Sequence, residues 1–383
     1  MNLRNHKNII ERRRYLGEKI GCSLASVGIY PQGLQKAGER NCENMIGATQ
    51  IPLGIAGPIT IRGRYATGDF FLPLATTEGA LVASVNRGCK AVTLSKGVSV
   101  YQEYVGITRG VALSTGSVGK GMEVKKWISQ NQPALAEITR KTSNHLNLIR
   151  VDSTVVADCL FIRLYFDSQD AMGMNMATIA SDAVIHFLEK KQGIKCVSLA
   201  GNYDIDKKPA WLNFILGRGR KVWAEVIIPE AIVRTVLKTT SEKINQVAIS
   251  KCYLGSIMSG SMGFNAHFAN IIAAVFTATG QDIAHTVEGS LGVTSTQVIE
   301  DNLHISVYLP DLIIGTVGGG TGLPAQEEAL KIMGINRENK GNSAAFYADI
   351  ITGAVLAGEV SLLAALSEGS LAASHQKLAR GKK

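Results

Sequence analysis

The sequence lacks the long apolar run that a membrane-spanning helix needs. Among its 383 residues, no stretch of about 18 or more is both apolar and free of charge. The first thirty residues are also too charged to contain the apolar core of a signal peptide. Because 46% of the residues are nevertheless apolar, the chain can bury substantial cores. We therefore expect a cytoplasmic protein of two or three structural units, with no membrane partner.

Cysteine is scarce and scattered. The six cysteines lie far apart and form no C-x-x-C pair, so they suggest neither a zinc site nor a disulfide framework. We expect reduced, mostly buried thiols and no bound metal.

The sequence also lacks the common nucleotide-binding and nucleic-acid-binding motifs. It has no G-x-G-x-x-G fingerprint, and the glycine-rich residues 116–121 lack the spacing of a Walker phosphate loop. The net charge of +9 would suit a polyphosphate partner, but the basic residues are dispersed without a zinc-finger, helix-turn-helix or RNP-type pattern. These absences disfavour nucleic acid and favour a small phosphate-rich molecule such as a nucleotide cofactor.

The chain does contain a charged turn at residues 201–210, with the sequence GNYDIDKKPA. It follows an apolar run at residues 194–199 that is typical of a strand, and its glycine, aspartates and proline can continue neither a strand nor a helix. Lys207 and Lys208 are therefore held on a constrained loop. A fixed ammonium beside carboxylates can neutralise an oxyanion as it forms. Taken alone, however, the segment is more simply a solvated loop.

Glu78 is a second candidate. Thr76 or Thr77 could cap a buried helix, which would place Glu78 in the first turn. On its own, a carboxylate there is most simply a complement to the helix dipole. A proton donor at this position needs burial or a second carboxylate to raise its pKa.

Two glycine-containing segments are suited to a dinucleotide. Residues 170–176 form a turn and begin a helix that continues to about residue 190, and free N–H groups at a helix N-terminus bind anions. The glycine loop at residues 315–322 lets backbone amides approach a diphosphate. The pattern further predicts helices over residues 9–20 and 354–366 and a strand over residues 222–228. Asp282 alone is most simply an N-cap, and His375 a solvated side chain.

Together these segments resemble 3-hydroxy-3-methylglutaryl-coenzyme A (HMG-CoA) reductase. The resemblance covers the chain from about residue 40 to 377, in the family's order, through residues 43–47, 51–58, 76–79, 170–176, 201–210, 280–282, 315–321 and 374–375. Residues 56–58 and the loop at 201–210 look like class I, which includes the eukaryotic enzymes, here in a soluble form without their membrane anchor. The resemblance implies reduction of HMG-CoA to mevalonate and free CoA by two hydrides from NADPH, with NADH possible.

The resemblance also implies roles for particular residues. Glu78 would be the proton donor, Lys207 would stabilise the oxyanion, and Asp282 would tune both. His375 would protonate the departing CoA thiolate. Substrate contacts are implied for Arg109, Asp206, Lys208 and Asn270, and CoA contacts for Ser84, Asn86, Arg87 and His267. Cofactor contacts are implied for Ser143, Asn144, Asp170, Met172, Gly173, Met174, Asn175, Gly318, Gly319 and Gly320.

One departure concerns the cofactor. Where eukaryotic members have an arginine for the 2′-phosphate of NADPH, this chain has Asn144, and Arg140, Lys141 or His145 would have to replace it.

The implied fold is α+β and has three parts. A short N-terminal helical region spans residues 1–50, a large α/β domain around a central helix spans residues 51–110 and 199–383, and an inserted ferredoxin-like cofactor-binding domain spans residues 111–198. The resemblance further implies a homodimer or homotetramer with sites at subunit interfaces, and a cis peptide near Asp204 and Ile205. Two alternatives stay open: another acyl-CoA-dependent oxidoreductase, and a non-catalytic module that binds coenzyme A or a nucleotide.

Overall fold

A mixed β-sheet organises this structure, a computed structural model that describes residue 3 and residues 6–336 and 341–369. Its main path runs β2–β1–β3–β7–β10–β9–β8. Adjacent strands are antiparallel except for the β1–β3 and β8–β9 pairs, which are parallel. The strands are β1 (Leu53–Arg62), β2 (Thr67–Ala75), β3 (Val98–Ser114), β7 (Gly219–Ile228), β8 (Gly263–Phe264), β9 (Gly292–Ile299) and β10 (Asn302–Leu312).

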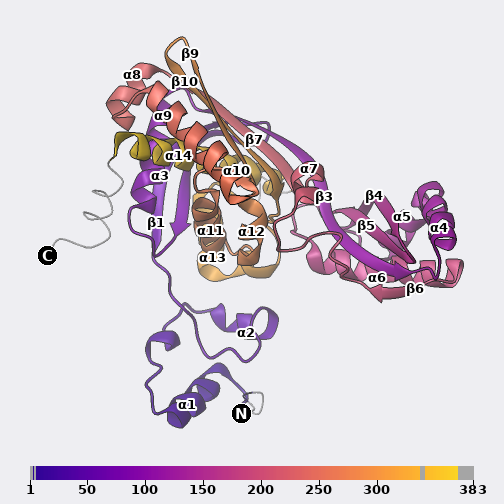
Figure 1. Cartoon of the computed structure of the whole chain (residues 1–383). Helices are drawn as coiled ribbons and strands as arrows, with labels where there is room; N and C mark the ends of the chain where they lie inside the picture. Colours follow the sequence, from indigo (N-terminus) through magenta and orange to yellow (C-terminus); the bar gives the residue numbers. More distant parts are fainter. Residues whose placement is uncertain (1–2, 4–5, 337–340, 370–383) are drawn as a thin grey trace.

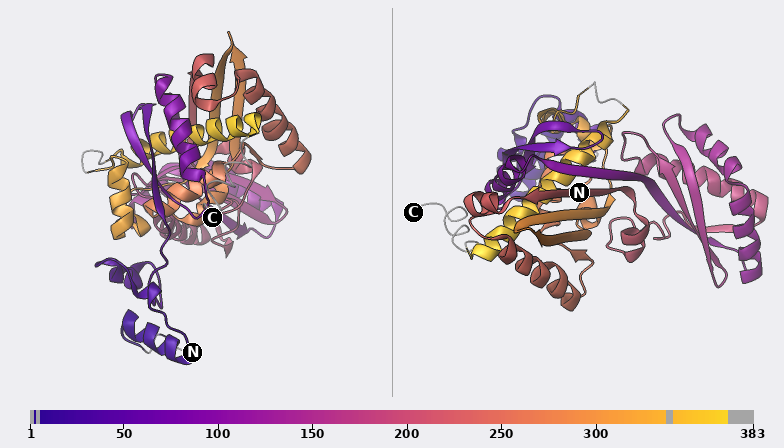
Figure 2. Two further views of the ribbon diagram at one scale, coloured as in Figure 1. Left: turned by 90° about the vertical axis from the view of Figure 1, so that its left-hand side faces the viewer. Right: turned by 90° about the horizontal axis from the view of Figure 1, so that it is seen from above.

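Helix α14 (Ser343–Glu368) runs through the middle of the larger part of the molecule (Figures 1 and 2). Helices α3 (Leu81–Leu94), α9 (Ser241–Ala248) and α11 (Phe268–Thr279) pack against it. Small residues allow this approach, because a Cβ on Gly88 would collide with the carbonyl oxygen of Ala357. Asp349 and Glu359 interrupt the apolar run of α14, so the sequence shows no long uncharged stretch there. By length and overall composition α14 could nevertheless cross a membrane, but 83% of its most apolar stretch is buried, as expected of a core helix.

The sheet presents one face to this helix. Along β10, Leu303, Ile305, Val307 and Leu309 are buried while the residues between them are partly exposed, which is the alternation of a strand with one face on the core. These side chains belong to the same apolar cluster as the buried residues of α14. Burial of this one cluster therefore fixes the strands and helices that carry the site.

The second half of β3 continues into a smaller part with its own apolar cluster. There β3 pairs with β5 (Cys159–Asp167) and β6 (Lys195–Ser198), and β5 pairs with β4 (Asn147–Val156), all antiparallel. Helices α4 (Val118–Gln130) and α5 (Gln132–Thr142) precede β4, and α6 (Met174–Gln192) joins β5 to β6. This β-α-β-β-α-β sequence, with strand order β4–β5–β3–β6, has the ferredoxin-like topology.

The N-terminal residues form a separate helical region that stands away from the sheet (Figure 1). Helix α1 (Ile9–Ile20) begins at Asn8, whose side chain accepts a hydrogen bond from the Glu11 N–H at 2.9 Å, and ends at Gly21 in a left-handed conformation. A short helix, α2 (Ala37–Arg40), contributes Ala37 to a small apolar cluster with Ile9 and Met45.

The structure confirms the mixed α+β fold. It also confirms the helix at residues 9–20 and the core helix, which begins earlier than predicted, at residue 343. The division into residues 51–110, 111–198 and 199–383 stays a prediction, and its first boundary falls inside β3.

Three local expectations are wrong. Of the six cysteines only Cys89 and Cys252 are buried, so the thiols are not mostly buried. Helix α3 begins at Leu81, because Ala80 has a φ of 74° and interrupts the helical backbone, so Glu78 lies in the preceding loop and not in the first turn. Among the described residues the cis peptide joins Gly57 to Pro58, and the bond expected near Asp204 is not cis.

Candidate active site

The charged loop at residues 201–210 turns through left-handed backbone angles. Asn202, Ile205 and Lys207 have φ values of 59°, 52° and 57°. This conformation is unfavourable for non-glycine residues, above all for β-branched isoleucine, and costs on the order of 1–3 kcal/mol per residue. The surroundings must therefore hold the loop, and strain of this kind is common at active sites.

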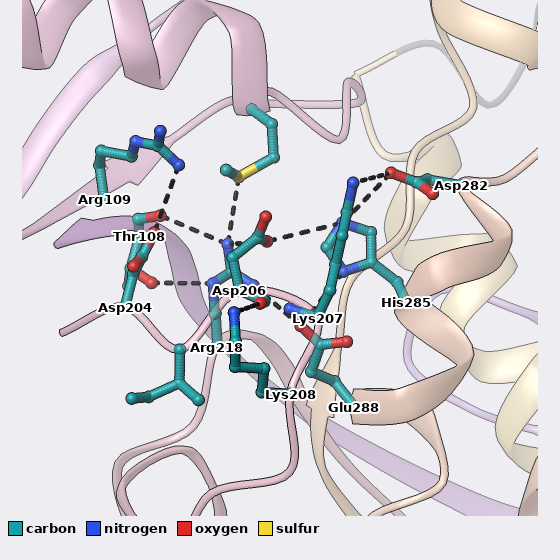
Figure 3. A network of polar contacts seen from close by, with 12 residues as sticks. Thr108, Arg109, Asp204, Asp206, Lys207, Lys208, Arg218, Asp282, His285 and Glu288 are labelled. Atoms are coloured by element: carbon teal, nitrogen blue, oxygen red, sulfur yellow. Dashed lines mark hydrogen bonds and ion pairs between the residues drawn. The ribbon is translucent and has the colours of Figure 1, made fainter. Parts of the chain in front are cut away.

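Lys207 extends its ammonium to Asp282 (Figure 3). The Nζ atom lies 2.8 Å from Asp282 Oδ2, and both side chains are partly exposed. The hydrogen bond to Asp282 raises the pKa of Lys207, against the opposing effect of burial. Burial tends to raise the pKa of Asp282, but the hydrogen bond from Lys207 and other favourable contacts lower it overall. At neutral pH this pair is therefore an ammonium held by a carboxylate.

Asp282 has a second function in the fold. Its Oδ1 accepts a hydrogen bond from the backbone N–H of Ala284 at 3.1 Å, which makes it the N-cap of the turn at Ile283–His285. The predicted capping contact and the predicted contact with the lysine are thus made by the two oxygens of one carboxylate.

Beneath the loop, the guanidinium of Arg218 is fully buried and contacts two carboxylates. Its Nη2 lies 2.9 Å from Asp206 Oδ1, and its Nη1 lies 3.2 Å from Glu288 Oε1. Glu288 Oε1 also accepts a hydrogen bond from the backbone N–H of Lys207. The buried positive charge of Arg218 and the buried negative charge of Glu288 are thereby paired. Such pairing is needed because an unpaired charge is costly to bury. The network ties the loop to the start of β7 and to α12 (Thr286–Gly289).

Two residues of β3 approach the loop from the other side (Figure 3). Arg218 Nε donates to Thr108 Oγ1 at 2.9 Å, and Arg109 Nη1 lies 3.5 Å from Asp204 Oδ2. The predicted substrate ligand Lys208 stays exposed, with its Nζ donating to Asn202 Oδ1 at 3.2 Å. The loop therefore presents two cationic side chains, Lys207 and Lys208, and Arg109 of β3 lies beside it.

A cavity of about 900 Å³ adjoins the loop. Of the predicted residues, Glu78, Ser84, His267 and Asn270 line it, and Pro209 brings the end of the lysine loop to its wall. Asn270 Nδ2 donates to Glu78 Oε2 at 2.9 Å. His267 Nε2 is buried and has no hydrogen-bond partner among the described residues. The volume is typical of a small-molecule site.

Two predicted CoA ligands lie outside this cavity. The Asn86 side chain accepts a hydrogen bond from the Gly57 N–H at 3.0 Å. Arg87 donates to the Ser361 carbonyl oxygen at 2.7 Å and to its hydroxyl at 3.0 Å. In this conformation both side chains hold α3 against neighbouring elements, and their contacts with CoA stay predictions.

The two segments predicted to bind a dinucleotide lie side by side. The backbone N–H of Thr316 donates to the carbonyl oxygen of Asp170 at 2.8 Å, and Ala171 and Val317 form a parallel β-bridge. The Asp170 carboxylate accepts from two backbone N–H groups of the segment that begins α14. The glycine loop and the start of α6 therefore border one region.

Glycines give this region open backbone. Gly318 and Gly319 have positive φ, and a Cβ on either would meet no atom within 4 Å. By contrast, a Cβ on Gly320 would collide with the carbonyl oxygen of Gly280. Gly173 precedes α6 without a side-chain cap, so the first N–H groups of that helix are free to bind an anion.

The remaining predicted cofactor residues differ in what their side chains contact. Met174 Sδ accepts from Arg218 Nη2 at 3.1 Å, which joins the cofactor segment to the network beneath the lysine loop. Met172 packs against the apolar cluster of the smaller part. The Ser143 hydroxyl accepts from the His145 N–H at 3.1 Å. Exposed amides are carried by Asn144 and Asn175.

Within one chain the predicted catalytic residues form two groups. Lys207 pairs with Asp282 after the C-terminal end of α11, whereas Glu78 pairs with Asn270 near its N-terminal end. About 14 Å of helix separates Asn270 from the end of α11, at roughly 1.5 Å per residue. In the described part of the chain, no hydrogen bond or ion pair joins Glu78 to Lys207 or Asp282. His375 lies outside the described residues.

Comparison with known proteins identifies the family. The family model for hydroxymethylglutaryl-coenzyme A reductase matches residues 8–380. The chain belongs to the HMG-CoA reductase family. The HMG-CoA reductases of Methanothermobacter thermautotrophicus and Methanocaldococcus jannaschii are 46% and 48% identical to it. These alignments cover 97% and 96% of this chain and 93% and 92% of the relatives.

A solved structure shares the fold. The class II HMG-CoA reductase of Streptococcus pneumoniae, bound to NADPH in open conformations, matches with a TM-score of 0.70 at 19% identity. The match covers 94% of this chain and 98% of that one. The reductase assignment made from the sequence is thus confirmed at the level of the family, whereas the class I-like assignment stays a prediction.

Sequence reasoning missed two charged residues of this HMG-CoA reductase site. Arg218 and Glu288 are buried beneath the lysine loop, and Asp204 is buried within the loop itself. Charged side chains are normally exposed unless paired, and their partners here lie far away in sequence. The available signal was weak: Glu288 lies six residues after Asp282, close enough to share one turn-rich segment.

Proposed function

We propose that this protein reduces HMG-CoA to mevalonate and free coenzyme A, with NADPH as reductant. The thioester carbonyl takes up a hydride and a proton, and the carbon–sulfur bond then breaks to give an aldehyde and the CoA thiol. A second hydride and proton convert the aldehyde to the alcohol. The observation that carries the proposal is the Lys207–Asp282 pair on a strained loop in a chain of this family.

Lys207 is the group that stabilises the developing charge. Each hydride addition converts a carbonyl oxygen into an alkoxide, and a fixed cationic donor lowers the barrier to that step. Asp282 raises the pKa of Lys207, so the side chain stays an ammonium throughout the neutral range. The loop fixes the position of this ammonium in advance of the reaction.

Glu78 is the proposed proton donor, and it reaches Lys207 from a second copy of the chain. In one chain Glu78 is exposed and contacts Asn270, about 14 Å of helix away from the end that carries the lysine pair. A second copy would cover Glu78 and bring it to the lysine pair. This supports a homodimer or homotetramer with composite sites.

NADPH fits between α6 and the glycine loop. The free N–H groups at the start of α6 and the open backbone at Gly318 and Gly319 are suited to the diphosphate. The reduced nicotinamide supplies the hydride when bound. Met174 joins this region to Arg218 beneath the lysine loop, so the two ligands would meet at the loop. Ser143, Asn144, Asp170, Met172 and Asn175 would complete the cofactor site.

The remaining roles follow the family resemblance. Arg109, Asp206 and Lys208 would hold the carboxylate and hydroxyl of the HMG group, with Asn270 from the cavity. Ser84, Asn86, Arg87 and His267 would hold CoA, and His375 would protonate its thiolate. We also propose a cytoplasmic location, with no nucleic-acid partner.

Substrate specificity tests the proposed reaction. Purified protein should oxidise NADPH with HMG-CoA, releasing one thiol for every two NADPH consumed. Acetyl-CoA and succinyl-CoA should support little or no oxidation. Comparable rates with those thioesters would favour a different acyl-CoA oxidoreductase, and tight CoA binding without oxidation of NADPH or NADH would favour the non-catalytic module.

Subunit complementation tests the composite site. Glu78→Gln and Lys207→Met should each be inactive alone, because each removes one of the two proposed catalytic groups from every site. Co-expressed at equal levels, they should restore about a quarter of the wild-type rate if sites form between two copies, since half of the random dimers then carry one intact site. No recovery from dimers verified to be mixed would place both residues in one subunit's site.

A further inference from the structure

The segment from Asp282 to Glu288 contacts both the side-chain ammonium and the backbone N–H of Lys207. Asp282 binds the side-chain ammonium at 2.8 Å, and Glu288 accepts a hydrogen bond from the backbone N–H of the same residue. The two carboxylates lie at the two ends of a short run of turns, the Ile283–His285 turn and α12. A single short segment therefore sets both the position of the lysine backbone and the direction of its side chain.

Among the described residues, the Glu288 carboxylate makes its hydrogen bonds and ion pairs through one oxygen. Oε1 accepts from Lys207 N, lies 3.2 Å from Arg218 Nη1 and lies 3.4 Å from His285 Nδ1. Its other oxygen, Oε2, has no hydrogen-bond partner among the described residues. The side chain is fully buried, so water does not compete for these donors.

The backbone at Lys207 needs such a partner. Its φ of 57° is left-handed and belongs to a loop with two further left-handed residues, so the local sequence does not by itself favour this conformation. Arg218, held by Glu288, also binds the side chain of the preceding residue, Asp206, at 2.9 Å. Both residues at the tip of the loop are thus supported from below (Figure 3).

We propose that Glu288, together with Arg218, is a positioning residue of the reductase, which holds Lys207 in the geometry that stabilises the oxyanion. This inference rests on the proposed function of Lys207. According to this proposal, kcat depends on Glu288, a buried residue that is not among the predicted catalytic residues.

A metal site is the competing explanation for this cluster. Asp206, His285 and Glu288 each present a possible ligand atom within 4.8 Å of the others. However, the guanidinium of Arg218 already contacts both carboxylates, so the positive charge that a metal ion would supply is in place. Positioning of the loop is therefore the better account.

Two substitutions of similar size separate positioning from simple space filling. Glu288→Gln keeps an oxygen that can accept from Lys207 N–H and Arg218, and its amide nitrogen would take the place of Oε2. Glu288→Met fills the same space without an acceptor. We expect Glu288→Met to lower kcat by on the order of 10²-fold, with a much smaller change in KM for HMG-CoA, and Glu288→Gln to lower it only a few-fold.

Controls separate activity from folding. Glu288→Met removes one of the two carboxylates that pair with the buried Arg218, so the double variant Glu288→Met/Arg218→Met removes the whole buried Glu288–Arg218 ion pair and is expected to fold. It should still have a low kcat, since the acceptor for Lys207 is missing. Asp349→Asn changes another buried carboxylate that accepts from backbone N–H groups, at Tyr65 and Ala66, and should lower Tm without lowering kcat.

The outcomes are distinguishable from a failure of the proposed reaction. If the wild-type protein does not oxidise NADPH with HMG-CoA, the proposed function fails. If the wild type is active but a folded Glu288→Met variant, or the folded double variant, turns over at nearly the wild-type kcat, Glu288 does not position Lys207. Equal loss of kcat in the Gln and Met variants would also overturn the proposal, because the hydrogen-bond acceptor would then be irrelevant.

Discussion

Replacing Lys207 by methionine separates the catalytic from the structural contribution of this side chain. The substitution keeps most of the length of the side chain but removes the ammonium that lies 2.8 Å from Asp282. Because the lysine side chain is 42% exposed, its ion pair is largely screened by solvent. Exposed pairs contribute about 0.2–1 kcal/mol to stability. We therefore expect Tm to fall by less than about 4 °C, if it changes at all.

The effect on turnover should be far larger. Loss of one donor to a developing oxyanion typically lowers kcat by about 10²–10³-fold, and Lys207 is the proposed cationic donor of this site. The rate would be followed as HMG-CoA-dependent loss of NADPH absorbance, beside thermal unfolding of the same preparation. The neighbouring Lys208→Met variant is the comparison, and it should raise KM for HMG-CoA more than it lowers kcat.

Two results would refute this reasoning. A Lys207→Met variant with near-normal kcat would show that another group stabilises the oxyanion. A variant whose Tm collapses would show that the ion pair supports the fold, so its inactivity would carry no information about the chemistry.

Three further predictions follow from the charges of the structure. Arg140→Ala should weaken NADPH binding more than NADH binding, and more than Lys141→Ala does, because Lys141 already pairs with a carboxylate at 3.3 Å; equal effects on the two cofactors would place the 2′-phosphate elsewhere. Asp282→Asn should shift the alkaline limb of the kcat profile to lower pH, because its hydrogen bond is the main cause of the raised pKa of Lys207; an unshifted limb would argue against this coupling. Asp311 is fully buried, and burial raises its pKa from 3.8 to about 8, so the folded state holds a proton that the unfolded state releases and stability should fall as pH rises through this range. In urea unfolding, the stability of Asp311→Asn relative to wild type should therefore increase from pH 4 towards pH 8, and a constant difference would contradict the shift.

Local sequence was sufficient for features that depend on neighbouring residues. The helix at residues 9–20 was predicted with its true ends, because Asn8 and Gly21 supply the cap and the left-handed stop within the chain itself. The constrained nature of the lysine loop followed from its glycine, aspartates and proline. The start of α3 was misplaced because Ala80 adopts a left-handed angle that alanine does not favour on its own.

Family resemblance supplied what local patterns could not. It named Glu78, Lys207 and Asp282 as one catalytic set, although they are separated by more than a hundred residues in the first case and by 75 in the second. The structure brings Lys207 and Asp282 together but leaves Glu78 with Asn270 in the same chain. The catalytic roles of all three stay predictions that the proposed experiments test.

The sequence by itself determined the family, through motifs spread along the chain. It also determined the two lysines on a constrained loop and the glycine-rich segments, because each of these depends on residue types in a short window. Only the tertiary structure decided that Glu288 and Arg218 lie under Lys207, since a charged residue in a sequence looks exposed until its distant partners are known. It also decided that Glu78 contacts Asn270 near the start of α11 whereas Lys207 contacts Asp282 after its end, because these contacts join residues that are far apart in the sequence.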